Sequence, residues 1–157
     1  MNSEYNQILQ FREYEPKDRA KCLEIFDSNR PDYFAEHERQ EFANFLDRID
    51  CLTYSVVELN GDIVACGGIY LADDSQHVGM AWGMVHRESH RNGIGRRLTI
   101  FRLEQMSEVD PLLEQRLATS QLPFGFYEKF GFKTVKVTEN GFGPGIDRYE
   151  MVRKGSF

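Results

Sequence analysis

The most informative segment of this sequence is Val85-His86-Arg87-Glu88-Ser89-His90-Arg91-Asn92-Gly93-Ile94-Gly95-Arg96-Arg97-Leu98. An apolar run that reads as a strand enters a polar, basic turn, and a helical pattern starts at the glycine pair. Glycine carries no side chain, so a phosphate can approach the backbone closely there. The first amides of a helix have no partner within the helix, and the helix dipole favours negative charge at that end. The segment therefore predicts a pyrophosphate site.

Three kinds of glycine loop bind phosphates in this way. A dinucleotide-binding fingerprint needs a third glycine at position 98, which is Leu98, and a Walker A loop needs Gly-Lys-Ser/Thr, which is absent. His90-Arg91-Asn92-Gly93-Ile94-Gly95 instead resembles the Gln/Arg-x-x-Gly-x-Gly/Ala loop of the GCN5-related N-acetyltransferases (GNAT family). His90 replaces the usual Gln or Arg, and Arg87 replaces the proline of the preceding Val-x-Pro, which should loosen the turn slightly.

A second motif further along supports the same resemblance. Phe126-Tyr127-Glu128-Lys129-Phe130-Gly131-Phe132 is similar to the family's Phe-Tyr-Glu-Lys-Leu-Gly-Phe, and one helix and one strand are expected between the two motifs. Ala118-Thr119-Ser120 ends the strand before it. The resemblance covers roughly residues 54 to 153, and the first 50 residues match in pattern only.

Apolar periodicity and turn residues predict the remaining elements. Asn60-Gly61 is the strongest hairpin signal in the chain. Expected strands cover Ile8–Tyr14, Thr53–Leu59, Ile63–Leu71, Val78–Val85, Leu112–Thr119, Phe132–Thr138 and Ile146–Val152. Expected helices cover Lys17–Ser28, Tyr33–Asp47, Ile94–Val109 and Pro123–Phe130, with a flexible Asn140–Gly145 connection between the last two strands. We expect one α/β (α+β) domain over residues 1–157, a GNAT fold with a mixed sheet of about seven strands flanked by about four helices. The fourth and fifth strands should be parallel neighbours.

The resemblance implies a donor, acetyl-coenzyme A, and roles for named residues. The fourth and fifth strands would splay apart at a bulge around the pantetheine arm, and the N–H of Val85 would polarise the thioester carbonyl. Tyr127 would be the general acid that protonates the departing thiolate, which a phenol of pKa about 10 does only where its environment helps. The expected donor-binding residues are Met84, Val85, His90, Arg91, Asn92, Gly93, Ile94, Gly95, Arg96 and Ser120. Arg97 adds positive charge.

The general base and the acceptor are left open. The family's usual strand-four Glu is absent from Val78–Met84, so His77, Asp73, Glu88 or a chain of water molecules remain candidates. Gly79, Ala81 and Gly83 give that strand a small-sided face, which would hold either substrate or a packed helix. Acceptor contacts are expected from the first two helices and the last hairpin. The residues named for this role are Tyr33, Phe34, Trp82 and Asp147, with Asn29, Arg30, Arg148 and Tyr149 nearby.

Composition excludes several other classes. The net charge of −6 disfavours nucleic-acid binding. The three separated cysteines (Cys22, Cys51, Cys66) fit a reducing, cytoplasmic compartment, and Cys66 should be buried. Met1–Tyr5 shows no signal peptide, and no apolar run is long enough to span a membrane. His86-x-Glu88-x-His90 lacks a third ligand, so no metal is expected. GNAT proteins often form homodimers, and a non-catalytic acyl-coenzyme A module of the same fold is the alternative function.

Overall fold

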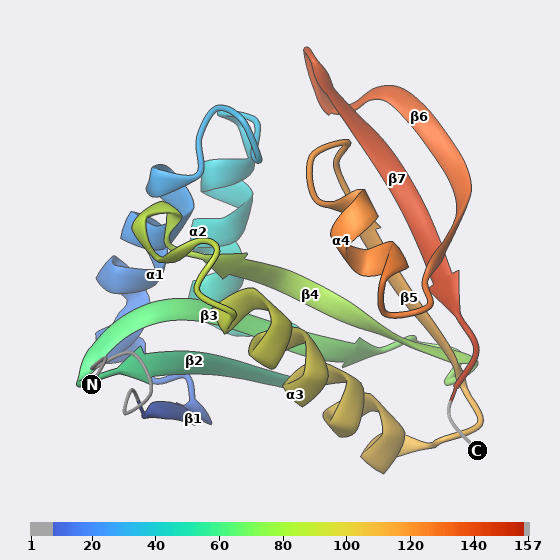
Figure 1. The fold of residues 1–157 in the computed structure, drawn as a ribbon, viewed down its shortest axis with the longest axis horizontal. Coiled ribbons are helices and arrows are strands. Elements are labelled where there is room, and N and C mark those ends of the chain that lie inside the picture. The colour runs from blue at the N-terminus through green and yellow to red at the C-terminus, as the bar shows by residue number, and fades with distance from the viewer. Residues whose placement is uncertain (1–7, 156–157) are drawn as a thin grey trace.

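The computed structural model of this protein describes residues 8–155, so Met1–Tyr5 lies outside the described residues. Seven strands and four α-helices follow one another in the expected order along this part of the chain (Figure 1). The strands are β1 (Leu9–Glu13), β2 (Thr53–Leu59), β3 (Asp62–Leu71), β4 (His77–Val85), β5 (Glu114–Thr119), β6 (Lys133–Gly143) and β7 (Ile146–Arg153). The helices are α1 (Arg19–Ser28), α2 (Glu38–Arg48), α3 (Ile94–Val109) and α4 (Phe124–Glu128), with short 3-10 turns η2 (Pro16–Asp18) and η3 (Arg87–Ser89).

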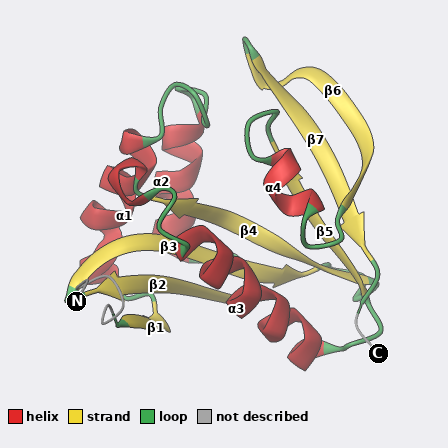
Figure 2. Ribbon diagram, in the orientation of Figure 1, coloured by secondary structure: helices red, strands yellow, loops and turns green. Residues whose placement is uncertain are grey.

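The strands form a single mixed sheet in the order β1-β2-β3-β4-β5-β7-β6, which confirms the predicted fold class (Figure 2). The first four strands pair antiparallel, and β4 and β5 are parallel neighbours as predicted. Asn60 and Gly61, with φ of 53° and 88°, make the tight turn between β2 and β3. Both central residues of a type I′ hairpin turn need positive φ, which explains why Asn-Gly signals one.

Helices cover both faces of the sheet. Tyr54 and Val56 on β2 are buried in a cluster with residues of α1 and α2, whereas Val57 is buried against Ile94 and Leu98 of α3. Successive side chains of a strand point to opposite faces, so α1 and α2 cover one face and α3 covers the other. Cys66 is buried in the α1–α2 cluster, as its sequence environment predicted.

Several predicted boundaries were wrong. Helix α2 begins at Glu38 rather than Tyr33, because the Glu38 carboxylate accepts the Ala35 N–H at 2.8 Å and holds the preceding residues in turns. Strand β6 continues to Gly143, five residues beyond its predicted end and into the glycine-rich connection that was expected to be flexible. Strand β5 begins only at Glu114, and α4 is shorter than predicted at both ends. Between residues 8 and 155, no helix is both long and apolar enough to cross a membrane.

Candidate active site

The sheet divides beside β4. Strands β4 and β5 pair only from His77 to Gly79, and beyond that point they separate (Figure 1). On the other edge of β4, Gly68 pairs with Ala81 and Cys66 pairs with Met84. Two residues of β4 therefore oppose one residue of β3, which defines a β-bulge at Trp82 and Gly83. Trp82 has φ of 44°, a backbone conformation that residues other than glycine rarely adopt, so the chain turns sharply at the bulge.

Beyond the bulge, the alternation of an antiparallel ladder sets which backbone groups face the gap. The His86 N–H donates to the Val64 carbonyl at 2.7 Å, so His86 is in a hydrogen-bonded pair. The next pair along, Val85 with Ala65, is then a pair without mutual hydrogen bonds, and Met84 returns to β3. This alternation favours Val85 over Met84 as the residue that turns its amide away from β3.

The carbonyl of Val85 is fixed by two side chains. Asn29 Nδ2 donates to it at 2.9 Å, and His90 Nε2 lies 2.8 Å from it. Because a carbonyl only accepts hydrogen bonds, the His90 ring must carry its hydrogen on Nε2. Asn29, named above as lying near the acceptor residues, is buried and also donates to the Ile25 carbonyl. It therefore fastens the end of α1 to the end of β4.

The glycine turn and the start of α3 lie beside this backbone. Gly93 is the residue before α3, with φ of 77°, and a Cβ placed there would meet no atom within 4 Å. A Cβ on Gly95 would lie 3.8 Å from both Phe126 Cζ and Val85 Cγ2, so α3, α4 and β4 converge here. Arg91 and Arg96 are exposed, and neither takes part in the ion pairs found among residues 8–155.

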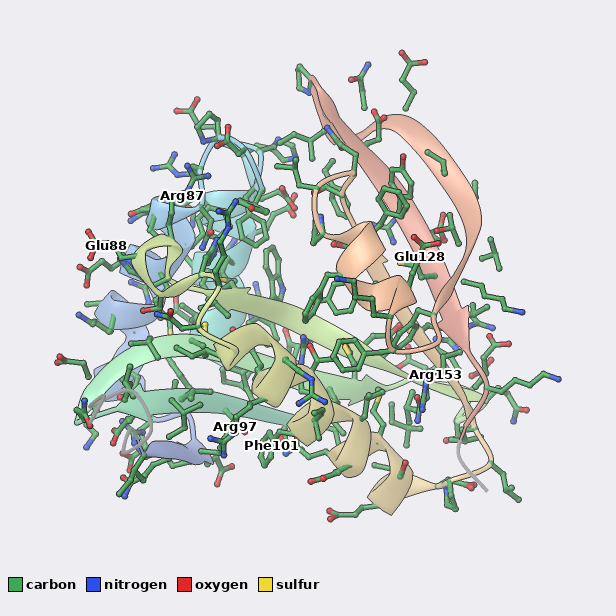
Figure 3. The ribbon with its side chains drawn as sticks, viewed as in Figure 1. Arg87, Glu88, Arg97, Phe101, Glu128 and Arg153 are labelled. Atoms are coloured by element: carbon green, nitrogen blue, oxygen red, sulfur yellow. The ribbon has the colours of Figure 1, made fainter. Side chains whose placement is uncertain are left out.

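Arg97 differs from the other arginines of this segment. Its guanidinium lies 5.8 Å from the ring centre of Phe11 on β1, and Phe11 stacks on Phe101 of α3. Figure 3 shows Arg97 and Phe101 on the part of α3 that faces β1. The charge of Arg97 is therefore used in packing α3 against the edge strand.

The η3 turn is tied to the loop between α1 and α2. The Arg87 N–H donates to Ser28 Oγ at 3.0 Å, and its guanidinium pairs with Asp32 at 2.7 Å. Tyr33 lies between Arg87 and His90, with 5.6 Å to the guanidinium and 5.5 Å to the imidazole ring. A proline could not donate the first of these bonds. The expected loosening by Arg87 was therefore wrong, since this residue anchors the turn.

Tyr127 lies on α4, half-buried, with its ring against Phe126 and Phe132. Arg102 Nη2 donates to its hydroxyl oxygen at 3.4 Å. Ser120, between β5 and α4, is buried, and its hydroxyl has no hydrogen-bond partner among the described residues. Both polar groups named from the second motif thus lie in this region with free hydrogen-bonding capacity.

Arg102 is the residue of this region that the sequence analysis missed. It is 2% exposed, and a Cβ placed on Gly83 would lie 2.6 Å from its guanidinium carbon. The guanidinium therefore links the bulge to the Tyr127 hydroxyl. A signal was present in the sequence, because Leu98, Arg102 and Met106 recur every four residues on the buried side of α3. A charged residue on such an apolar stripe is unusual.

The motifs and the geometry agree with comparisons to known proteins. A family model described as an acetyltransferase (GNAT) domain matches residues 50–134, more than half of the chain. The chain belongs to the GNAT acetyltransferase family. No curated protein sequence matches it.

Solved structures of other GNAT proteins share the whole fold. The ribosomal-protein-S18-alanine N-acetyltransferase of Escherichia coli superposes with a TM-score of 0.76 at 16% identity, covering 96% of each chain. Ard1 of Thermoplasma volcanium gives 0.76 at 19% identity, covering 95% of this chain and 99% of the other. An aminoglycoside 6'-N-acetyltransferase complexed with coenzyme A gives 0.72 at 15% identity, covering 92% and 96%. At these identities the similarity concerns the fold alone.

In this GNAT chain, two of the expected acceptor residues belong to an aromatic cluster. Phe34 stacks on Phe26 with 4.5 Å between ring centres, and Trp82 lies 5.1 Å from Phe42. The Trp82 carbonyl also accepts a hydrogen bond from Tyr54 at 2.8 Å. The rings of Phe34 and Trp82 are packed in this cluster and remain partly exposed, so together they form one wall beside the bulge.

A cavity of 460 Å³ lies between the α1–α2 loop and the turn of the last hairpin. The loop approaches the hairpin closely, because a Cβ on Gly143 would lie 2.7 Å from that of Ala35. Asp147, expected near the acceptor, accepts the Asn140 N–H at 2.9 Å and so braces the hairpin turn. The cavity is lined by Pro31, Ala35, Glu36, His37, Pro144 and Ile146.

One carboxylate near this cavity is buried. Burial raises the pKa of Glu38, while the hydrogen bond from the Ala35 amide opposes that rise. By accepting the Ala35 N–H, its carboxylate holds the turn that leads into α2. The base candidates named from the sequence lie elsewhere: Glu88 is exposed on η3 and His77 begins β4. Within residues 8–155 no three His, Cys, Asp or Glu side chains are grouped closely enough to hold a metal ion.

Proposed function

We propose that this GNAT protein is an N-acetyltransferase that moves an acetyl group from acetyl-coenzyme A to a primary amine of a small molecule or peptide. The observation that carries the proposal is the convergence of three features at one place. These are the bulge where β4 leaves β5, the glycine-flanked start of α3, and a tyrosine hydroxyl on α4 connected to the bulge through Arg102.

The residues present fit the donor. The amides of the first α3 turn, with Arg91 and Arg96, would hold the diphosphate, because they are donors and positive charges without ion-pair partners in residues 8–155. The unpartnered Ser120 hydroxyl would contact the pantetheine arm, and the Val85 N–H would face the thioester at its end. The remaining donor-binding residues that we propose are Met84, His90, Asn92, Gly93, Ile94 and Gly95. Of these, His90 acts by holding the Val85 carbonyl rather than by touching phosphate. Bound acetyl-coenzyme A supplies a thioester, whose carbonyl carbon is open to attack by an amine.

The chain supplies two groups for that attack. The Val85 N–H would stabilise the negative charge that develops on the carbonyl oxygen. Tyr127 would give its proton to the sulfur as the carbon–sulfur bond breaks. A cationic amine first loses one proton and so becomes a nucleophile, and its nitrogen loses a second proton as the amide forms; water is the acceptor of both that we favour. Tyr127 regains its proton from solvent.

The acceptor would approach from the α1–α2 loop and the last hairpin, past Tyr33, Phe34, Trp82 and Asp147. The cavity there is lined by Glu36, whose carboxylate favours a cationic acceptor over an anionic one. Three free cysteines fit the reducing, cytoplasmic compartment that we expect.

The test is release of free thiol from acetyl-coenzyme A in the presence of polyamines, amino acids, aminoglycosides or peptides. We expect turnover with at least one amine, and Tyr127→Phe should lower kcat about 10²-fold while leaving donor affinity within about twofold. Tight donor binding without turnover on any amine would instead identify a non-catalytic acyl-coenzyme A module. Equal activity of wild type and Tyr127→Phe would remove Tyr127 from the mechanism.

A further inference from the structure

Arg102 is a buried cation without a counter-charge. It is 2% exposed, and no ion pair found among residues 8–155 includes it. Its Nε atom has no hydrogen-bond partner in the described part of the chain, and its one side-chain contact of this kind is with Tyr127. Burying the charge of an arginine costs roughly several kcal/mol of folding free energy unless other groups offset that cost. An apolar residue here would continue the stripe from Leu98 to Met106 without that cost.

The sheet has been shaped to admit this side chain. A Cβ on Gly67 of β3 would lie 3.4 Å from Arg102 Cδ, and a Cβ on Gly83 of β4 would lie 2.6 Å from its Cζ. Both neighbouring strands thus have glycine, which carries no side chain, where Arg102 passes beneath them. The side chain of Arg102 therefore occupies part of the space beside the small residues of β4. Its guanidinium reaches the bulge and the Tyr127 hydroxyl together.

The chemistry of the contact determines the direction of the Tyr127 hydrogen. A guanidinium has five N–H donors and no acceptor, so the phenol oxygen must accept in this bond. The phenol hydrogen is then free to point at another group. The 3.4 Å separation is long, and such contacts often shorten when a substrate is bound.

We propose that Arg102 is a positioning residue that makes Tyr127 a proton donor to the leaving sulfur. This inference rests on the proposed function. When the new carbon–nitrogen bond forms and the carbon–sulfur bond breaks, sulfur leaves with the electron pair and takes the phenolic proton. The phenolate that remains is next to the buried Arg102 guanidinium, and a charge-assisted hydrogen bond between these two groups is strong. The arginine thus supplies the favourable environment that a phenol needs to protonate a thiolate.

The matched variants are Arg102→Met, which keeps length and apolar packing, and Arg102→Lys, which keeps the charge. Losing a charge-assisted bond should lower kcat of Arg102→Met about 10- to 100-fold with KM for acetyl-coenzyme A nearly unchanged. Arg102→Lys should recover part of that loss. In the Tyr127→Phe background the Met change should cost less than about threefold, because the two residues act as a unit.

Thermal unfolding separates this role from a structural one. Arg102 has no paired carboxylate, so replacing it with Met leaves no buried charge without its counter-ion. Arg102→Met should therefore unfold at the same temperature as wild type or higher. A large fall in its unfolding temperature, with kcat of the folded protein unchanged, would overturn the proposal and make Arg102 a structural residue.

A binding measurement gives a readout that does not depend on turnover. At pH 8.5, coenzyme A should bind the wild type more tightly than desulfo-coenzyme A, and both Arg102→Met and Tyr127→Phe should lose that difference. Full additivity of the two substitutions in kcat, or an unchanged preference for the thiol, would refute the inference while acetyl transfer by the wild type stands. Absence of turnover in the wild type on any amine would refute the proposed function instead. In that case a preserved thiol preference that depends on Arg102 would still support the contact.

Discussion

Gly83→Ala tests the arrangement at the bulge while keeping the chemical identity of both Arg102 and Tyr127. The added methyl would lie 2.6 Å from Arg102 Cζ, and carbon atoms in contact normally stay about 3.5–4.0 Å apart, so the guanidinium must move about 1 Å. Because the guanidinium is the far end of a flexible side chain, the cost in stability should be near the lower end of overpacking, about 1 kcal/mol. For a chain of this size that lowers the unfolding temperature by roughly 2–4 °C.

The larger effect should be on turnover. The contact between Arg102 Nη2 and Tyr127 Oη is 3.4 Å long already, and a further 1 Å would place it beyond the range of a hydrogen bond, about 3.5 Å. We therefore expect kcat for acetyl transfer to fall about 10- to 100-fold, the cost of a lost charge-assisted bond. Steady-state kinetics with the best amine of the acceptor panel measures this.

Gly67→Ala is the matched control for Gly83→Ala. Its methyl would meet Gly83 Cα at 3.2 Å and Arg102 Cδ and Nε at 3.4 Å, so it enters the same slot at a distance that does not force the guanidinium to move. Its kcat should stay within about threefold of wild type. In an Arg102→Ala background, Gly83→Ala should have little further effect because the space is then free. Loss of equal size at Gly67, or full activity of Gly83→Ala, would refute the reasoning.

Three further predictions concern the donor-loop residue Gly93, the buried carboxylate of Glu38 and the buried side chain of Asn29. Gly93→Glu should abolish donor binding measured by calorimetry. Gly93→Ala bears the same backbone strain, about 1 kcal/mol at φ of 77°, and should keep most of the donor affinity. Equal losses of affinity in the two variants would mean that strain alone is responsible. Burial raises the Glu38 pKa, so between its unfolded value, about 4.3, and its folded value only the folded state holds the proton and stability falls as pH rises. Urea unfolding should therefore show that Glu38→Gln gains stability over wild type as pH rises from 4 to 7, and a gap independent of pH would contradict this. Asn29→Ala should cost about 1–3 kcal/mol in chemical denaturation and weaken donor binding, because it frees the Val85 carbonyl, whereas the exposed Asn44→Ala should do neither.

Local signals in the sequence predicted much of the fold. The Asn60-Gly61 turn, the apolar alternation of Thr53–Leu59 and the glycine-led helix Ile94–Val109 all depend on contacts between residues close in sequence. The start of α2 could not be read in the same way, because the Glu38 carboxylate and the Phe34 ring are fixed by burial and by packing on Phe26. Apolar periodicity from residue 33 onward therefore suggested a helix that begins too early.

The sequence predicted the backbone features of the site but not the side-chain contacts that support them. The resemblance predicted a bulge where the fourth and fifth strands separate, and the pairing of β3 with β4 shows one at Trp82 and Gly83. Arg102 was not found, and Asn29 was named for the acceptor rather than for the Val85 carbonyl, because each acts across a long separation in sequence, on Tyr127 and on Val85. A buried charge on the apolar side of α3 was the one local sign of the second contact.

The central claim is that the start of α3 and the gap beside β4 bind an acyl-coenzyme A through its diphosphate and its pantetheine arm. Isothermal calorimetry with coenzyme A and with pantetheine, which lacks the nucleotide and diphosphate, tests it directly. We predict binding of coenzyme A that is at least about 100-fold tighter than that of pantetheine, equivalent to about 2.7 kcal/mol, and loss of that advantage in Gly93→Glu. No measurable heat with coenzyme A, or equal affinity for the two compounds, would contradict the account.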